Sequence, residues 1–338
     1  MSIDTSPVTK KPLLTIAVPT YNSSKYIKRL VKSILIQDLK DTELIFVDDG
    51  SSDNTLEIIE SIFVDELFRE YKIYKNIKNV GLDLNVINCL KRSKGNFVWL
   101  LGHDDFLALG AVSAVISALT EAHDIGGLFL NYSIFDNTNE QIVKQSWVTE
   151  IDKNLILDGD EFWTLLGAAP SFISSMIHNK EIALSTNFER YIGTDWLDFG
   201  IILEYAKKSK MSALSGVHLI GAGDSSETPW NTKGSALMAC CDLAEIILSH
   251  RADYSSSALT SLKRSMFLVL KRKGISARAA GLNISKELFV RLKRNFGEQS
   301  GYYLFMFSII VPGAVYRFLL KIYHQRHVKK LYWLLKKT

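Results

Sequence analysis

The sequence predicts an α/β fold in which a mainly parallel β-sheet is covered by helices on both faces. Short apolar runs rich in strand-forming residues alternate with stretches whose apolar residues recur at the helical period. This alternation is typical of a parallel sheet, because each crossover helix covers one face. Three of the apolar runs end in polar clusters, and ligands of open α/β sheets bind at these carboxyl ends of strands.

The N-terminal part of the chain contains four such strand-helix pairs. Farther along, the region from residue 127 to about 220 combines shorter strands with one helix near 195–208, and the chain is helical from about residue 235. The predicted strands are 13–18, 43–47, 72–75 and 97–101. The first predicted helix is capped by Ser23 and Ser24 and has apolar positions from Ile27 to Leu35. The other predicted helices are one from Asp53 or Asn54 to Phe68, one that follows the Gly81 loop and ends at about Arg92, and one over 107–123. We expect three parts: a loose leader over 1–12, an α/β domain over 13–234, and a basic helical region over 235–338.

The charge of the chain is distributed unevenly. Residues 263–338 contain 17 Lys and Arg and two acidic residues, a net charge of +15, whereas the whole chain carries only +4. A basic tail on an acidic body indicates an anionic partner, either a nucleic acid or an anionic membrane leaflet. Aromatic and basic residues are interleaved with an apolar run over 302–323, which favours a helix lying on a membrane over one that spans it. We therefore expect no nucleic acid; an ordinary packed helical subdomain is the other alternative.

The cysteines and the N-terminus indicate a reducing compartment. The chain has three cysteines, Cys89, Cys240 and Cys241, and this set does not resemble a disulfide framework. The first residues lack the apolar segment of a signal peptide. We expect a peripheral protein on the cytoplasmic side of the inner membrane.

The first two polar clusters follow the first two strands. Pro19-Thr20-Tyr21-Asn22 offers an aromatic ring and small polar groups that can stack on and hydrogen-bond a nucleobase, although an ordinary turn would contain the same residues. Asp48 and Asp49 can accept hydrogen bonds from a base or ribose. Their alternative role is to favour the helix dipole, a role that Asp53 is expected to fill as a helix cap.

The third cluster, Gly102-His103-Asp104-Asp105, follows an almost wholly apolar strand. Adjacent carboxylates repel each other unless a cation compensates them. A divalent ion held by these hard oxygens and by substrate phosphates would do so, whereas a solvated loop with a capping Asp is the alternative. The cluster therefore predicts a Mg²⁺ or Mn²⁺ site.

The order of these clusters resembles that of the family 2 glycosyltransferases of the GT-A fold, over roughly residues 13–230. PTYN and VDDGSSDNT at this spacing, followed by NVG and HDD, carry the resemblance. It implies a Rossmann-like GT-A catalytic domain over 13–234 that uses a nucleotide-sugar donor. The residues implied to bind the nucleotide are Pro19, Thr20, Tyr21, Asn22, Asp48, Asp49, Gly81 and Asp104.

The resemblance also implies a metal site and a general base. Asp104 and Asp105 would hold the metal, with His218 assisting, although Gly102 stands where the family more often has its first acid. Gly193-Thr194-Asp195-Trp196 resembles the family's Glu-Asp-Trp segment, which makes Asp195 the general base; a helix cap is the alternative. The side chains expected to face the acceptor are Trp196, Trp230 and Ser175.

Within the family, the GHDD ending, the SFISS segment and the basic tail are most similar to bacterial O-antigen enzymes, including abequosyltransferase-like members. This resemblance implies inverting transfer of a sugar to a polyprenyl-diphosphate-linked saccharide. The alternative is a catalytically inert nucleotide-binding module that recruits partners to a membrane. A dinucleotide oxidoreductase is disfavoured because no strand is followed by GxGxxG.

Overall fold

The computed structural model describes residues 11–65, 70–137, 139–149, 151–222, 235–279 and 284–310. The expected acceptor residue Trp230, the tail beyond Ile310 and most of the leader lie outside these ranges. The chain divides into two compact units: Met1–Phe162 with Ala169–Gly223, and Trp163–Ala168 with Asp224–Thr338. The first unit ends at Gly223, near the expected domain end at 234. The second unit also contains the segment Trp163–Ala168, which the sequence had placed in the first domain.

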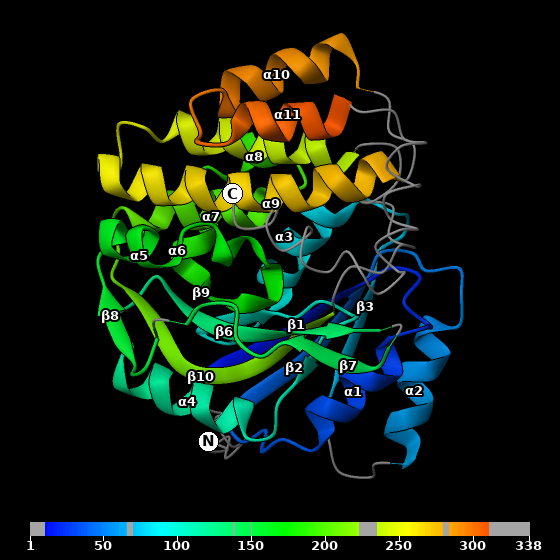
Figure 1. Cartoon of the computed structure of the whole chain (residues 1–338). Helices are drawn as coiled ribbons and strands as arrows, with labels where there is room; N and C mark the ends of the chain where they lie inside the picture. The colour runs from blue at the N-terminus through cyan, green and yellow to red at the C-terminus, as the bar shows by residue number, and fades with distance from the viewer. Residues whose placement is uncertain are drawn as a thin grey trace, which may run out of the picture. The chain divides into compact units, whose positions relative to one another are not determined.

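Within its described residues, the first unit is built on one sheet with the strand order β3-β2-β1-β4-β9-β6-β10-β5, where β7 pairs with β6 and β8 with β10. In Figure 1, helices α1, α2 and α4 lie below this sheet and α3, α6 and α7 lie above it. The strands are β1 Leu14–Thr20, β2 Thr42–Asp48, β3 Lys72–Lys75, β4 Phe97–Leu100, β5 Phe106–Leu107, β6 Gly127–Asp136, β7 Gln141–Lys144, β8 Leu155–Leu157, β9 Met176–Asn179 and β10 Met211–Ala222.

The helices of the first unit follow its strands. They are α1 Ile27–Leu35, α2 Thr55–Asp65, α3 Leu82–Arg92, α4 Ala111–Glu121, α6 Lys180–Leu184 and α7 Leu197–Ala206. Short 3₁₀ turns lie at Ala169–Ser171, Ile173–Ser175 and Phe188–Tyr191. Helix α5, Gly159–Leu166, has its first residues in the first unit and its last residues in the second.

The α/β prediction is confirmed, and the sheet has two different halves. β3, β2, β1 and β4 are parallel neighbours, and every residue of β1 is buried, as expected of a strand covered on both faces. Beyond β4 the sheet is mixed, because β9 pairs antiparallel with both β4 and β6. The expectation of a mainly parallel sheet therefore holds only where strands and helices alternate in the sequence.

The start of the predicted 107–123 helix is not helical. Phe106 and Leu107 form β5, which pairs antiparallel with Ile220 and Leu219 of β10, and α4 begins only at Ala111. Gly110 precedes the helix in the left-handed conformation (φ 79°), which glycine adopts without steric cost. Strand pairing with β10, more than a hundred residues away in the sequence, thus prevails over the local helical pattern at residue 107.

The described part of the second unit is helical, as expected: α8 Ser235–Ser249, α9 Ser256–Ala279, α10 Lys286–Phe296 and α11 Tyr302–Ile310. Leu237, Leu262, Leu270 and Phe296 are buried in it. Within the described ranges, none of the helices combines the length and apolar character needed to cross a bilayer.

Candidate functional site

The strand order of the first unit has a reversal point at β1. β1 lies between β2 and β4, so the chain moves outward on one side through β2 and β3 and then returns to the other side at β4. In open α/β sheets, ligands bind outside the carboxyl ends of the strands at this reversal point. The three polar clusters follow β1, β2 and β4, and so they meet at this edge.

The loops after β1 and β2 are joined by side-chain hydrogen bonds. The buried Thr20 hydroxyl donates to Asp48 Oδ1 (3.2 Å), and the Ser52 amide donates to Asn22 Oδ1 (2.9 Å). Asp48 is fully buried and also accepts the Ser51 amide and hydroxyl. The Asp48 carboxylate therefore holds the two loops together, and it has little accepting capacity left for a ligand.

Asp49 shapes the next loop along the edge. Its carboxylate accepts hydrogen bonds from Asn76 Nδ2, the Val80 amide and the Gly81 amide, each at 2.9 Å. Gly81 has φ 87° and ψ 162°, a backbone conformation that is essentially restricted to glycine. Among the expected nucleotide residues, Pro19, Thr20, Asp48 and Asp49 are buried, and Tyr21 is 48% exposed.

The acidic pair after β4 is held by a serine from the 3₁₀ turn before β9. The Ser174 hydroxyl donates to Asp105 Oδ2 (2.5 Å) and accepts the Gly102 amide (2.7 Å), and Asp105 is 2% exposed. A Cβ atom at Gly102 would lie 2.8 Å from Asp105 Oδ2 and 3.1 Å from Ser174 Oγ, so the family's more usual acid would require these side chains to shift. Glycine at this position is therefore compatible with the Ser174–Asp105 hydrogen bond as it stands.

Arg29 of α1 lies beside this pair, and the sequence did not single it out. Its Nη2 donates to the Asp104 carbonyl oxygen (2.7 Å), its Nη1 donates to Asn137 Oδ1 (2.9 Å), and its guanidinium lies 4.5 Å from the ring centre of Phe106. Burial lowers the pKa of Arg29 from its ordinary value, and the charges of Asp104 and Asp105 oppose that shift. The sequence predicted a divalent ion as the compensating charge and not a basic side chain, because no spacing distinguishes Arg29 from the other basic residues of α1.

The residues present fit a divalent ion only as an incomplete ligand set. Among the described residues, no three His, Cys, Asp or Glu side chains gather as a metal-binding group. His218 does not join the acidic pair in such a group, and its Nε2 lies 2.8 Å from the Ser215 carbonyl oxygen. The half-exposed Asp104 carboxylate, together with Asp105, is suited to an ion whose remaining ligands are phosphate oxygens and water.

Asp195 lies in a loop before α7 and does not cap that helix. It is exposed and left-handed (φ 61°), while the N-cap position is Trp196, which makes no side-chain capping bond. The helix-cap alternative for Asp195 is therefore wrong. Trp196 is half-buried, and Ser175 is fully buried with its hydroxyl donating to the Phe172 carbonyl (2.6 Å).

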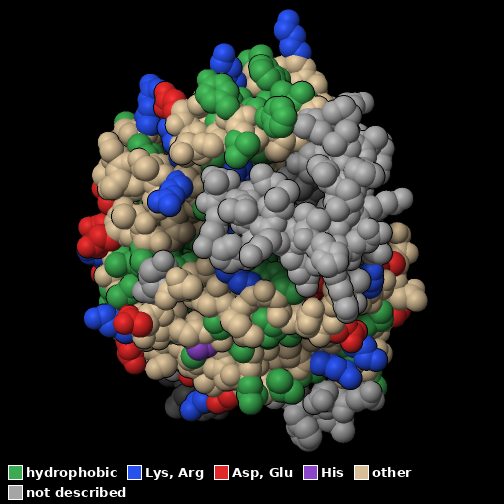
Figure 2. All heavy atoms as spheres, viewed as in Figure 1, with side chains coloured by type: hydrophobic (Ala, Val, Ile, Leu, Met, Phe, Trp, Pro, Cys, Tyr) green, Lys and Arg blue, Asp and Glu red, His purple; other side chains and the backbone are tan. Residues whose placement is uncertain are grey.

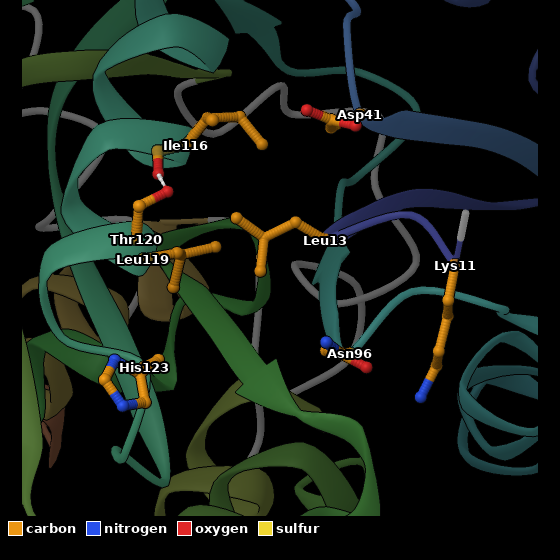
Figure 3. Close-up of a pocket in the computed structure, with 8 residues that line it drawn as sticks. All are labelled: Lys11, Leu13, Asp41, Asn96, Ile116, Leu119, Thr120 and His123. Atoms are coloured by element: carbon orange, nitrogen blue, oxygen red, sulfur yellow. Dashed lines mark hydrogen bonds between the residues drawn. The ribbon is translucent and has the colours of Figure 1, made fainter.

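A separate pocket of about 410 Å³ opens at the opposite edge of the sheet, where the amino ends of β1, β2 and β4 lie (Figure 3). It is lined by Lys11, Leu13, Asp41, Asn96, Ile116, Leu119, Thr120 and His123. None of the predicted site residues borders it.

Comparison with known proteins agrees with this geometry. The model of the family "Glycosyl transferase family 2" matches residues 15–176, which include the three polar clusters and end before Asp195. A Campylobacter jejuni GalNAc(5)-diNAcBac-PP-undecaprenol beta-1,3-glucosyltransferase is 36% identical over 175 residues, covering 50% of this chain and 54% of that protein. Abequosyltransferase RfbV of Salmonella typhimurium is 27% identical over 194 residues, covering 54% and 58%. This chain thus spans little more than half the length of these two relatives.

Solved structures share the fold at low sequence identity. Residues 1–349 of TarS from Staphylococcus aureus superpose with a TM-score of 0.59 at 16% identity, covering 92% of this chain and 91% of that one. The mannosyltransferase PcManGT from Pyrobaculum calidifontis, solved with GDP-Man and Mn²⁺, superposes with a TM-score of 0.54 at 14% identity, covering 91% and 87%. Residues 15–176 of this chain are therefore a glycosyl transferase family 2 domain, carried by a fold of the GT-A type.

Proposed function

We propose that this chain is an inverting glycosyltransferase that moves a sugar from a nucleoside-diphosphate sugar to a polyprenyl-diphosphate-linked saccharide in bacterial surface polysaccharide or O-antigen synthesis. The observation that carries the proposal is the meeting of three polar loops at the reversal point of a family 2 domain. The name of one relative supports the acceptor class, since it is a glucosyltransferase of a PP-undecaprenol saccharide. The other relative, an abequosyltransferase, supports sugar transfer as the reaction class.

Each part of the edge has a task in this reaction. The exposed ring of Tyr21 stacks on the base, and the loop organised by Asp49 and Gly81 closes around the nucleotide. Asp104 and Asp105 would hold Mg²⁺ or Mn²⁺, which would supply positive charge beside the departing nucleoside diphosphate.

Asp195 is the proposed general base. The acceptor oxygen attacks the anomeric carbon while the bond from that carbon to the diphosphate oxygen breaks, and the hydroxyl proton passes to the Asp195 carboxylate. One displacement inverts the anomeric centre and needs no covalent enzyme intermediate. An exposed carboxylate suits this task, because the acceptor must reach it from solution.

A donor screen tests the proposal. UDP-, GDP-, CDP- and dTDP-sugars are added to the full chain with and without Mn²⁺, and the melting temperature and nucleoside-diphosphate release are measured. We expect one nucleotide class to raise the melting temperature in a Mn²⁺-dependent way, and Asp104→Asn to remove most of that rise. Asp124→Asn, which changes an exposed carboxylate before β6, is the matched control.

Each outcome of the screen has a separate meaning. Binding that survives EDTA unchanged would remove the metal from the mechanism. Binding without transfer to any polyprenyl-diphosphate-linked saccharide would favour the inert nucleotide-binding module. No binding by any of the four classes would contradict the proposed function.

We also propose that the second unit holds the enzyme to the anionic cytoplasmic face of the inner membrane. Tyr303, Leu304, Phe307 and Ile310 of α11 are exposed, and so are Phe289 and Val290 of α10 beside basic Lys286 and Lys293. Figure 2 shows hydrophobic side chains gathered over α10 and α11 with Lys and Arg side chains next to them. Aromatic and basic groups combined in this way favour the interface of an anionic leaflet.

Liposome flotation tests the membrane proposal. The double substitution Tyr303→Ser/Phe307→Ser should remove most binding of the full chain to anionic vesicles, and salt should weaken wild-type binding because it screens surface charge. Leu109→Ser is the control, since Leu109 is an equally exposed apolar residue of the first unit (81%). Unchanged flotation of the double variant would place the membrane contact elsewhere.

A further inference from the structure

A buried carboxylate from α3 contacts the loop that carries Asp195. Asp83 lies in the first turn of α3, is 8% exposed, and accepts the Gly193 amide on Oδ2 at 2.6 Å. The two residues are 110 positions apart in the sequence. This distance is short for an amide-carboxylate hydrogen bond, as expected of a charged acceptor.

The contacted loop has an unusual backbone. Gly193 and Asp195 both have positive φ angles, 83° and 61°. The amide and the hydroxyl of Thr194 both donate to the Tyr191 carbonyl oxygen, at 3.2 and 2.6 Å, so the Gly193 amide provides the hydrogen bond between this loop and α3. Besides burial, the Asp195 charge raises the pKa of the Asp83 carboxyl.

The Gly193 contact bears on the backbone of Asp195. A non-glycine residue with a positive φ is strained and is stabilised by the contacts around it. Trp196, the N-cap residue of α7, makes no side-chain capping bond. The Asp83 carboxylate instead holds the amide two residues before Asp195.

The electrostatics of Asp83 agree with a role beyond its own helix. Burial raises the pKa of the Asp83 carboxyl above its ordinary value, the Gly193 hydrogen bond lowers it, and the Asp195 charge raises it further. An acid placed only to favour the α3 dipole would remain exposed, as Glu57 does in the first turn of α2. Asp83 instead is buried against the loop.

We propose that Asp83 is a positioning residue for Asp195: its buried carboxylate holds the Gly193 amide and so fixes the loop from which the Asp195 side chain projects. The inference rests on the proposed role of Asp195 as general base. It assigns Asp83 to the acceptor side of the reaction, although α3 follows the nucleotide loop at Gly81 in the sequence.

Two measurements on the full chain test this proposal. Hydrogen exchange of the backbone amides of 192–197, in the absence of any substrate, is compared among wild type, Asp83→Asn and Glu57→Gln. Nucleoside-diphosphate release is then measured with the donor class that the screen identifies and a polyprenyl-diphosphate-linked saccharide. Asp83→Ser, with a smaller neutral acceptor, gives the same comparison should Asp83→Asn fail to fold.

We expect Asp83→Asn to exchange the 192–197 amides at least about tenfold faster, and to lower kcat by about 10–100-fold while the donor KM stays within about twofold. Glu57→Gln should match wild type in both measurements. Unchanged exchange, or an unchanged kcat, would overturn the proposal. A wild type that releases no nucleoside diphosphate from any donor would contradict the proposed function instead, and exchange would still decide whether Asp83 holds the loop.

Discussion

The loop after β4 and the loop before α7 both present carboxylates, yet they are held in opposite ways. Asp105 is buried, is bonded by Ser174, and belongs to a loop that Arg29 clamps through the Asp104 carbonyl. Asp195 is exposed and left-handed, and its loop is fastened to α3 through one carboxylate, Asp83. The first loop is fixed by several elements, whereas the second is held by local hydrogen bonds of Thr194 and by the Gly193 contact with α3.

In the proposed mechanism, this difference corresponds to two kinds of chemical task. Groups that stabilise developing charge act best when they are fixed before the reaction begins. A group that removes a proton from an incoming acceptor must stay open to that acceptor. We therefore expect substitutions at the first loop to change stability and donor binding together, and substitutions at the second to change turnover alone.

The largest expected effect is that of Asp195→Asn. The amide keeps the size of the side chain but cannot take a proton, so turnover should fall by about 10²–10⁴-fold while donor binding is retained. Steady-state nucleoside-diphosphate release and calorimetric donor affinity measure the two quantities separately.

Asp41→Asn is the matched control for Asp195→Asn, since Asp41 is also an exposed, left-handed Asp (φ 56°) but precedes β2 at the far edge of the sheet. Turnover near the wild-type value in Asp195→Asn would contradict the proposed role of Asp195, and another residue would then be the general base. Asp198 would be the next candidate, although its Oδ1 lies 3.0 Å from the buried His178 Nε2.

A smaller effect is expected at the first loop for Arg29→Met. Losing the two charged hydrogen bonds should lower the free energy of unfolding by about 1–3 kcal/mol. Because Met leaves Asp104 and Asp105 without their cationic neighbour, Mn²⁺ should stabilise the variant more than it stabilises wild type. Thermal unfolding with and without Mn²⁺ measures both effects.

Arg92→Met is the control for Arg29→Met, since Arg92 also lies over an aromatic ring, that of Tyr74, but is exposed at the end of α3. Equal Mn²⁺ stabilisation of Arg29→Met and wild type would mean that Arg29 does not compensate the acidic pair. The contrast between the two loops would then rest on Ser174 alone.

The sequence by itself determined the parallel half of the sheet and the edge where the polar clusters meet. Apolar period and strand ends depend on residues only a few positions apart, so β1, β2, β3 and β4 could be predicted from local pattern. The carboxyl ends of parallel strands share an edge, which brings Thr20, Asp48 and Asp104 to one place without further information. The order of these clusters was specific enough to indicate the family.

Only the tertiary structure decided what holds the acids at that edge. The hydrogen bonds from Arg29 to Asp104, from Ser174 to Asp105 and from Gly193 to Asp83 join residues 75, 69 and 110 positions apart. The same holds for two antiparallel pairings. β9 pairs with β4, where the alternation of parallel strands and helices ends, and β5 pairs with β10, where the sequence predicted the start of a helix. Such contacts form when chain closure brings distant segments together, and no local period records which segments will meet.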